Sequence, residues 1–437
     1  MSPVAALMGL LALAYFGSML VGGRAIRGYG LPSGTEFLIL GIFIGPKFLG
    51  LLTRSGLSSF EPLILFGLTW LSMTIGLHYG LVGDRRVAAR RMFAGLGLAL
   101  LATVTTGTVA LLFTLALTDF GALDAAVLAL GCAAVSTETT RHAVRWVTER
   151  YGATGSVSEL VAEVSEADDL VPIATLAVLF ALVPQTDAVA LPLPAWALVL
   201  ATIGAGGIMG ATCASLVDIE PRSSQRWGIV LGAMLLTAGT SMRLGLSAIT
   251  AAFVMGLVAA SLMRSRTLVL RMVAPTERAV MVPTLVVAGA CVTIPDLPGF
   301  TAIALGVLGA RVVAKQASAR LLTRTQEKAI PRTSLGLGLL PAGVLTMAVG
   351  LACALRFPGP VGDTILAVAA IHVVLGEVVG PAMLRRALRL SDEVPASAAA
   401  TPMPRPRPKP AERPRRGSRG SRGSLAGSRS SDPRGTS

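Results

Sequence analysis

The chain has 437 residues, of which 53% are hydrophobic and only 14% are charged. Together with a mean hydropathy of +0.70, this composition excludes an ordinary soluble protein, in which about a quarter of the residues are charged. The formal net charge of +14 arises from loops and from the C-terminal end, so it does not indicate a nucleic-acid-binding fold.

The apolar residues form stretches of about 17 to 25 residues, the length that an α-helix needs to cross roughly 30 Å of hydrocarbon. The alternating pattern of membrane-spanning strands is absent. We therefore predict an all-α polytopic membrane protein. Its first span is expected to be a retained helix rather than a secretory signal, because it lacks a positively charged start and a cleavage site. The thirteen predicted spans cover residues 3–22, 36–52, 61–81, 92–117, 122–147, 158–183, 193–215, 227–242, 245–262, 279–294, 300–322, 333–355 and 361–384.

Basic residues alternate between the two sides of these spans. Connections after the odd-numbered spans hold most of the Lys and Arg residues, whereas the opposite connections hold only Lys47, Arg54, Arg243 and Arg356. Lys and Arg near span ends stay in the cytoplasm. The bias therefore predicts a protein of the inner (plasma) membrane with its N-terminus outside and its C-terminus in the cytoplasm.

The cysteines and histidines do not form a metal site in the sequence. Four cysteines lie inside apolar spans without ligand-like spacing, and the chain has three histidines in total. We predict no cofactor and no disulfide.

The composition changes abruptly at about Ser391 to Pro, Ser, Gly, Ala and Arg. We predict a transmembrane domain over residues 1–390 and a disordered, basic cytoplasmic tail over 391–437. Such a tail suits anionic membrane lipids as a partner. Nucleic acid is not expected as a partner, because no aromatic residues are interleaved with the arginines.

Two adjacent carboxylates, Asp168 and Asp169, interrupt the sixth span. They lie about ten residues from its cytoplasmic end, about 15 Å deep and close to the middle of the bilayer. Ionisable residues at that depth are rare and usually functional. Adjacent carboxylates in a medium of low dielectric repel each other and lose hydration, which favours binding of a proton or a cation. The other interpretation is that the pair caps a half-helix or lies at a hydrated bend.

Lys315, in the eleventh span, is a second buried charge, and a nearby carboxylate would provide its partner. The alternative for Lys315 is that its side chain extends to the cytoplasmic head groups. Arg311, one turn deeper, has the same two alternatives.

Two other spans are predicted to be broken helices. The fifth contains five consecutive polar residues, which include Ser136, Thr137 and Glu138. The twelfth contains Pro341 and Gly343 at mid-depth, where proline removes a helical hydrogen bond. Broken helices in corresponding positions of two halves indicate a transporter's binding site, although Pro and Gly kinks also occur without that role.

Several motifs in order resemble the monovalent cation:proton antiporter family, in particular its bacterial Na+/H+ and potassium-efflux branch. The resemblance runs over about residues 30–388. Its motifs are Gly41-Ile42-Phe43-Ile44-Gly45-Pro46, Gly76-Leu77 before Asp84-Arg85-Arg86, Ser136-Thr137, Asp168-Asp169, the segment 244–257 and Lys315.

The resemblance implies two inverted five-helix repeats, formed by spans two to six and nine to thirteen, and an elevator-like movement of a core domain past a dimerising domain. It also implies a homodimer, with Asp169 as the ion and proton carrier and Asp168 as the partner of Lys315. Asp at position 168 would suggest electrogenic exchange. Ser136, Thr137, Glu138, Pro341 and Gly343 would line the ion site at the crossing helix ends.

Some residues depart from the family pattern. Glu138 stands where relatives often have Pro or Asp, and His372 and Glu377 lie about one turn apart in the last span. Glu377 and Glu166 are therefore further candidates for the ion path.

We expect a secondary antiporter that exchanges Na+ or K+ for protons at Asp169, and not an enzyme. Two alternatives remain open from the sequence. One is a sodium-coupled solute symporter, which would need an arginine near the polar break to bind an anion. The other is a non-transporting sensor or scaffold whose basic tail recruits a partner.

Overall fold

The computed structural model describes residues 34–52, 61–79, 89–183, 192–220, 222–323 and 332–394. The first predicted span and residues 395–437 of the predicted tail lie outside these ranges.

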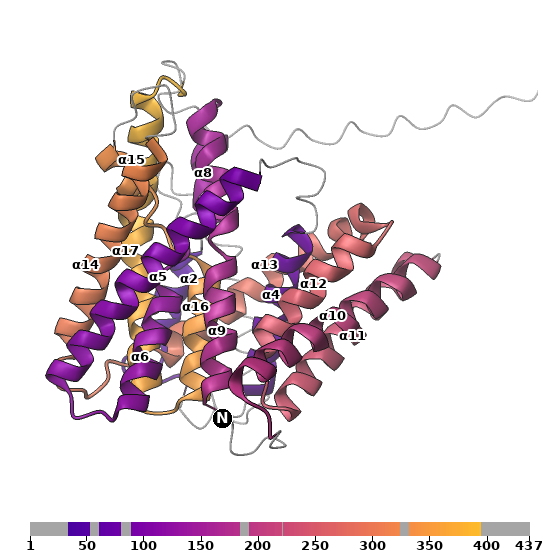
Figure 1. Ribbon diagram of the computed structural model, residues 1–437. Helices are drawn as coiled ribbons and strands as arrows, with labels where there is room; N and C mark the ends of the chain where they lie inside the picture. Colours follow the sequence, from indigo (N-terminus) through magenta and orange to yellow (C-terminus); the bar gives the residue numbers. More distant parts are fainter. Residues whose placement is uncertain are drawn as a thin grey trace, which may run out of the picture. The chain divides into compact units, whose positions relative to one another are not determined.

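All regular secondary structure in the described ranges is α-helical, as the composition predicts (Figure 1). The helices are α2 (Thr35–Ile44), α4 (Glu61–Tyr79), α5 (Ala89–Leu117), α6 (Ala122–Val135), α7 (Arg141–Tyr151), α8 (Ser156–Ala167), α9 (Leu170–Leu182), α10 (Ala195–Ile219), α11 (Ser223–Arg243), α12 (Ala248–Leu262), α13 (Arg266–Cys291), α14 (Phe300–Thr323), α15 (Arg332–Gly338), α16 (Val344–Arg356) and α17 (Pro360–Leu390).

The helices follow the predicted spans, except that three spans are each divided into two helices and that α2 ends early. Five helices among the described residues are long and apolar enough to cross a membrane, namely α4, α5, α10, α14 and α17. The fifth, sixth and twelfth predicted spans are each divided into two shorter helices, α6–α7, α8–α9 and α15–α16. Helix α2 ends at Ile44, just before Gly45-Pro46, and not at residue 52.

Helix α13 begins at Arg266 rather than at the predicted residue 279. Hydropathy detects only the apolar half of this helix, because its first half contains Arg271 and Glu277 among other polar residues. Residues 266–278, which the sequence predicts to be a connection, therefore form three further turns of helix instead.

Two inverted five-helix repeats organise the fold. The first contains α2, α4, α5, α6–α7 and α8–α9, and the second contains α12, α13, α14, α15–α16 and α17. Helix α2 packs on α13 and α12 packs on α4, and the repeat relation exchanges these two contacts. Gly41 and Gly289 lie at the first contact, and Gly256 and Gly76 lie at the second. A Cβ atom on any of the four would collide with a backbone carbonyl of the facing helix, so glycine permits both close approaches.

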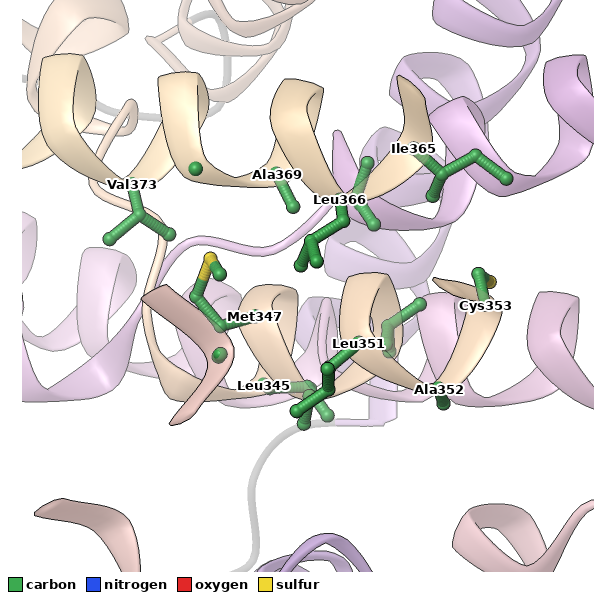
Figure 2. Packing of buried hydrophobic residues seen from close by; sticks show 14 of the residues in the cluster. Leu345, Met347, Leu351, Ala352, Cys353, Ile365, Leu366, Ala369 and Val373 are labelled. Atoms are coloured by element: carbon green, nitrogen blue, oxygen red, sulfur yellow. The ribbon is translucent and has the colours of Figure 1, made fainter. Parts of the chain in front are cut away.

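The helices pack into two lobes. The scaffold lobe contains α2, α4 and α10–α13, and the core lobe contains α5–α9 and α14–α17. Within the core lobe, Met347 of α16 points toward the side of α17 that carries Leu366, Ala369 and Val373 (Figure 2). Van der Waals packing of these apolar side chains holds the half-helix α16 against the long helix α17, because lipid tails are as apolar as the side chains and supply no hydrophobic driving force.

Candidate ion-binding site

The two broken helices cross where each is unwound. Helix α6 ends at Val135 and α7 begins at Arg141, while α15 ends at Gly338 and α16 begins at Val344. The unwound segments bond to each other: the Thr140 N–H donates to the Pro341 carbonyl at 2.9 Å, and the Thr139 hydroxyl donates to the Leu339 carbonyl at 3.1 Å. The crossing thus supplies bonds to backbone groups that the interrupted helices leave free, as the bilayer interior requires.

Glu138 neutralises the start of α16. Its Oε2 accepts from the Thr346 N–H and hydroxyl, both at 2.6 Å, and from the Gly343 N–H at 3.3 Å. These donors lie at the N-terminal end of the half-helix, where the helix dipole favours a negative charge. Glu138 is 3% exposed, so these hydrogen bonds replace those that water would make to its carboxylate.

Arg311 of α14 supplies a positive charge at the crossing, where Glu138 supplies a negative one. Its guanidinium donates to the Glu138 carbonyl at 2.7 Å and the Leu340 carbonyl at 2.9 Å, with a longer contact of 3.4 Å to the Val135 carbonyl. Carbonyls here lie at or just beyond the C-terminal ends of α6 and α15, where a cation is favoured. Arg311 therefore bonds to the crossing and does not extend to the head groups.

Lys315 lies one turn further along α14 and binds Asp168. Its Nζ is 3.2 Å from Asp168 Oδ2 and donates to the Thr137 carbonyl and the Thr139 hydroxyl, each at 2.7 Å. Both side chains of the ion pair are almost fully buried, with exposures of 5% for Lys315 and 2% for Asp168. Asp168 thus already has a cationic partner, supplied by the protein itself.

Asp169 differs from its neighbour, because no described residue is bonded to its carboxylate. It lies at the break between α8 and α9 and is 4% exposed. In the described part of the chain, its carboxylate makes no hydrogen bond or ion pair. It lines a cavity of about 10 Å³, about the space of one water molecule. The cavity is formed by Leu71, Ile75, Glu138, Thr140, Arg141, His142, Asp169, Glu277, Val344 and Leu345.

This arrangement can bind a small cation or a proton. A buried carboxylate without a partner is costly when it is charged and empty. It is therefore stabilised by either ligand, and the two must compete. No group of three or more His, Cys, Asp and Glu in the described ranges could hold a resident metal ion, and a transported cation would be a substrate.

Comparison with known proteins agrees with this chemistry. A family model described as "Sodium/hydrogen exchanger, transmembrane" matches residues 11–389. The chain belongs to the sodium/hydrogen exchanger family. This confirms the resemblance seen in the sequence, and it makes the chain a multi-pass membrane transporter rather than an enzyme. Membership supports cation:proton antiport as the class of activity.

Solved structures of the sodium proton antiporter MjNhaP1 from Methanocaldococcus jannaschii have the same fold. One, determined at pH 8, has a TM-score of 0.68 and 16% identity, and covers 89% of this chain and 98% of MjNhaP1. A second, from electron microscopy, has a TM-score of 0.63 and 18% identity over the same shares of the two chains. No curated protein matches this exchanger by sequence.

Several candidate residues of the exchanger lie near the crossing without lining the cavity. The Ser136 hydroxyl donates to the Cys132 carbonyl at 2.5 Å and lies 3.4 Å from His372 Nδ1. The Thr137 hydroxyl bonds to the Thr103 hydroxyl at 2.8 Å. Gly343 contributes its N–H to Glu138. These residues shape the site through their bonds to it.

The two further carboxylate candidates lie elsewhere in the exchanger. Glu166 is 3.9 Å from Arg145, with its side chain 32% exposed. Glu377 is buried on α17 and accepts a bond from the Thr35 hydroxyl of α2 at 3.4 Å. Neither lines the cavity at Asp169.

Three charged or titratable residues of the cavity escaped the sequence analysis as site residues: Arg141, His142 and Glu277. Glu277 belongs to the part of α13 that hydropathy missed. The sequence feature that these residues share is a charged or titratable side chain close to a predicted break or span end. This feature is weak evidence for a site residue, because most such side chains face water.

Proposed function

We propose that the protein is a secondary antiporter in which a monovalent cation, Na+ or K+, and protons compete for Asp169. One observation carries this proposal: Asp169 is buried and makes no hydrogen bond or ion pair with the described residues, while the adjacent Asp168 is bound to Lys315 at 3.2 Å. The pairing leaves one carboxylate of the couplet free for a ligand. Because the free group is stabilised by either ligand, loading one releases the other.

The size of the cavity supports a small ion over an organic solute. About 10 Å³ accommodates one water molecule, whereas sites for organic ligands are of the order of hundreds of Å³. An arginine does line the cavity, as an anion-binding symporter would need, but Arg141 lies 3.8 Å from the carboxylate of Glu277. These features favour antiport over solute symport.

The test is cation-driven proton exchange in vesicles that contain the purified protein. Addition of Na+ or K+ should dissipate an acid-inside gradient, and Asp169→Ala should abolish the response. Glu149→Gln, which removes a negative charge from the exposed side of α7, is the control and should exchange like the parent. Full exchange by Asp169→Ala would show that another group carries the ions. Solute uptake that requires Na+ and moves no protons would favour the symporter.

We further propose that exchange proceeds by an elevator-like movement of the core lobe past the scaffold lobe. The two lobes meet where the Thr250 hydroxyl of α12 donates to the Ile173 carbonyl of α9 at 3.0 Å. A disulfide between cysteines introduced on the facing sides of α9 and α12, in a background without the four native cysteines, should stop exchange. Reductant should restore it. Unchanged exchange by the cross-linked protein would argue against relative movement of the lobes.

The remaining assignments also belong to this proposal. The basic bias of the connections supports a cytoplasmic C-terminus in the inner (plasma) membrane. A homodimer and binding of anionic lipids by the basic tail complete the proposed assembly. Asp at position 168 supports electrogenic exchange, which a membrane-potential dye in the same vesicles would detect.

A further inference from the structure

Arg141 has an unusual position for a cation. It is the first residue of α7, where the positive end of the helix dipole disfavours positive charge. Its side chain is only 11% exposed, so water compensates little of that cost. A nearby carboxylate would compensate the charge of a guanidinium in this position.

Three carboxylates line the same cavity as Arg141: Glu138, Asp169 and Glu277. The Glu138 carboxylate already accepts hydrogen bonds from two N–H groups and a hydroxyl at the start of α16. The guanidinium is therefore left with Asp169, which would carry the transported ion, or Glu277.

The structure shows Arg141 with Glu277. Arg141 Nη2 lies 3.8 Å from Glu277 Oε1, and His142 Nε2 lies 3.7 Å from the same oxygen. Glu277 belongs to α13 of the scaffold lobe, whereas both partners belong to α7 of the core lobe. One scaffold carboxylate thus holds the charged start of α7.

We infer that Glu277 is a positioning residue that keeps the Arg141 guanidinium away from Asp169. An arginine paired with Asp169 would act as a tethered cation that competes with the substrate cation. Glu277 removes this competitor by offering it another carboxylate across the lobe interface. This inference rests on the proposed function, since it concerns access of the transported cation to Asp169.

The test is a double-mutant cycle with Glu277→Gln, Arg141→Gln and the combined variant. Glu277→Gln should raise the apparent KM for Na+ by about fivefold, the equivalent of an ion pair of about 1 kcal/mol. The combined variant should return KM to near the parent value, because the competitor is gone. Arg141→Gln alone should not raise KM, because it removes the competing cation and leaves Glu277 in place. Glu149→Gln is again the charge-matched control.

A merely structural role for Glu277 gives a different pattern. Loss of packing between the lobes would lower the yield or Vmax of Glu277→Gln and of the combined variant alike, without rescue by Arg141→Gln. An unchanged KM in Glu277→Gln, or a raised KM that the second substitution does not restore, would overturn the inference.

Binding of radioactive sodium to the solubilised variants separates this inference from the proposed function. If the parent binds sodium but exchanges neither Na+ nor K+ for protons, the proposed function fails, and the same cycle measured as binding affinity still decides the role of Glu277. If the parent exchanges sodium and the cycle shows no coupling, only the inference fails. A parent that neither binds nor exchanges Na+ or K+ would overturn both.

Discussion

Replacement of Arg311 by methionine tests whether the crossing of the broken helices depends on this guanidinium. The side chain is 1% exposed and donates short bonds to two carbonyls, at 2.7 and 2.9 Å. Methionine fills much of the same volume but donates no hydrogen bond. The variant therefore leaves carbonyls at the ends of two half-helices without their donor.

The magnitude follows from counting these bonds. A hydrogen bond to a charged group contributes about 1.5–3 kcal/mol. Two short bonds then amount to about 3–6 kcal/mol of lost stability, when the 3.4 Å contact to the Val135 carbonyl is counted as nothing. A loss of this size lies at the severe end of the range for single substitutions.

Thermal unfolding of the detergent-solubilised protein, followed by tryptophan fluorescence, measures this loss. Arg356→Met is the matched control, because Arg356 donates to the Val183 carbonyl at 2.9 Å from a half-buried position. Its unfolding midpoint should fall much less than that of Arg311→Met. Equal midpoints for Arg311→Met and the parent would refute the view that Arg311 holds the crossing together.

Other predictions address packing, the tail and the ion pair. Gly256→Ala should lower the unfolding midpoint, because its Cβ would meet a backbone carbonyl of α4; an unchanged midpoint would contradict that close approach. Removal of residues 395–437 should preserve cation-driven proton exchange in vesicles. Loss of exchange would favour the alternative in which the tail recruits a partner. Glu393→Ala should destabilise the protein by about 2 kcal/mol or more, since this carboxylate accepts from two N–H groups at the start of α8 at 2.7 and 2.8 Å; parent-like unfolding would disprove it. Asp168→Asn should cost about 3–5 kcal/mol by leaving Lys315 buried without its partner, and adding Lys315→Met should recover part of the midpoint; strictly additive losses would argue against direct coupling.

The sequence predicted a structural feature correctly where hydropathy averaged over a long segment, or the type of a few residues, is sufficient evidence for that feature. Membrane spans were predicted because hydropathy summed over about 20 residues depends little on tertiary contacts. The breaks at Thr137 and Pro341 were also predictable, since consecutive polar residues and a proline are locally incompatible with a helix in hydrocarbon. The predicted range of helix α13 was too short, because the charged first half of this helix resembles a loop when only hydropathy is considered.

Tertiary structure decided how the charges are distributed among partners. Asp168 and Asp169 are chemically identical neighbours, but one meets Lys315, 147 residues away in sequence, and the other faces the cavity. Local pattern cannot make that distinction, because adjacent residues near a helix end point in different directions and their partners come from other helices. The same holds for Glu277 and Arg141, whose contact joins the two lobes. The sequence alone thus determined the solvent of this protein and the depth of the Asp168-Asp169 couplet, whereas the packing of distant helices decided which of the two acids remains free, because electrostatic pairing depends on distances in space.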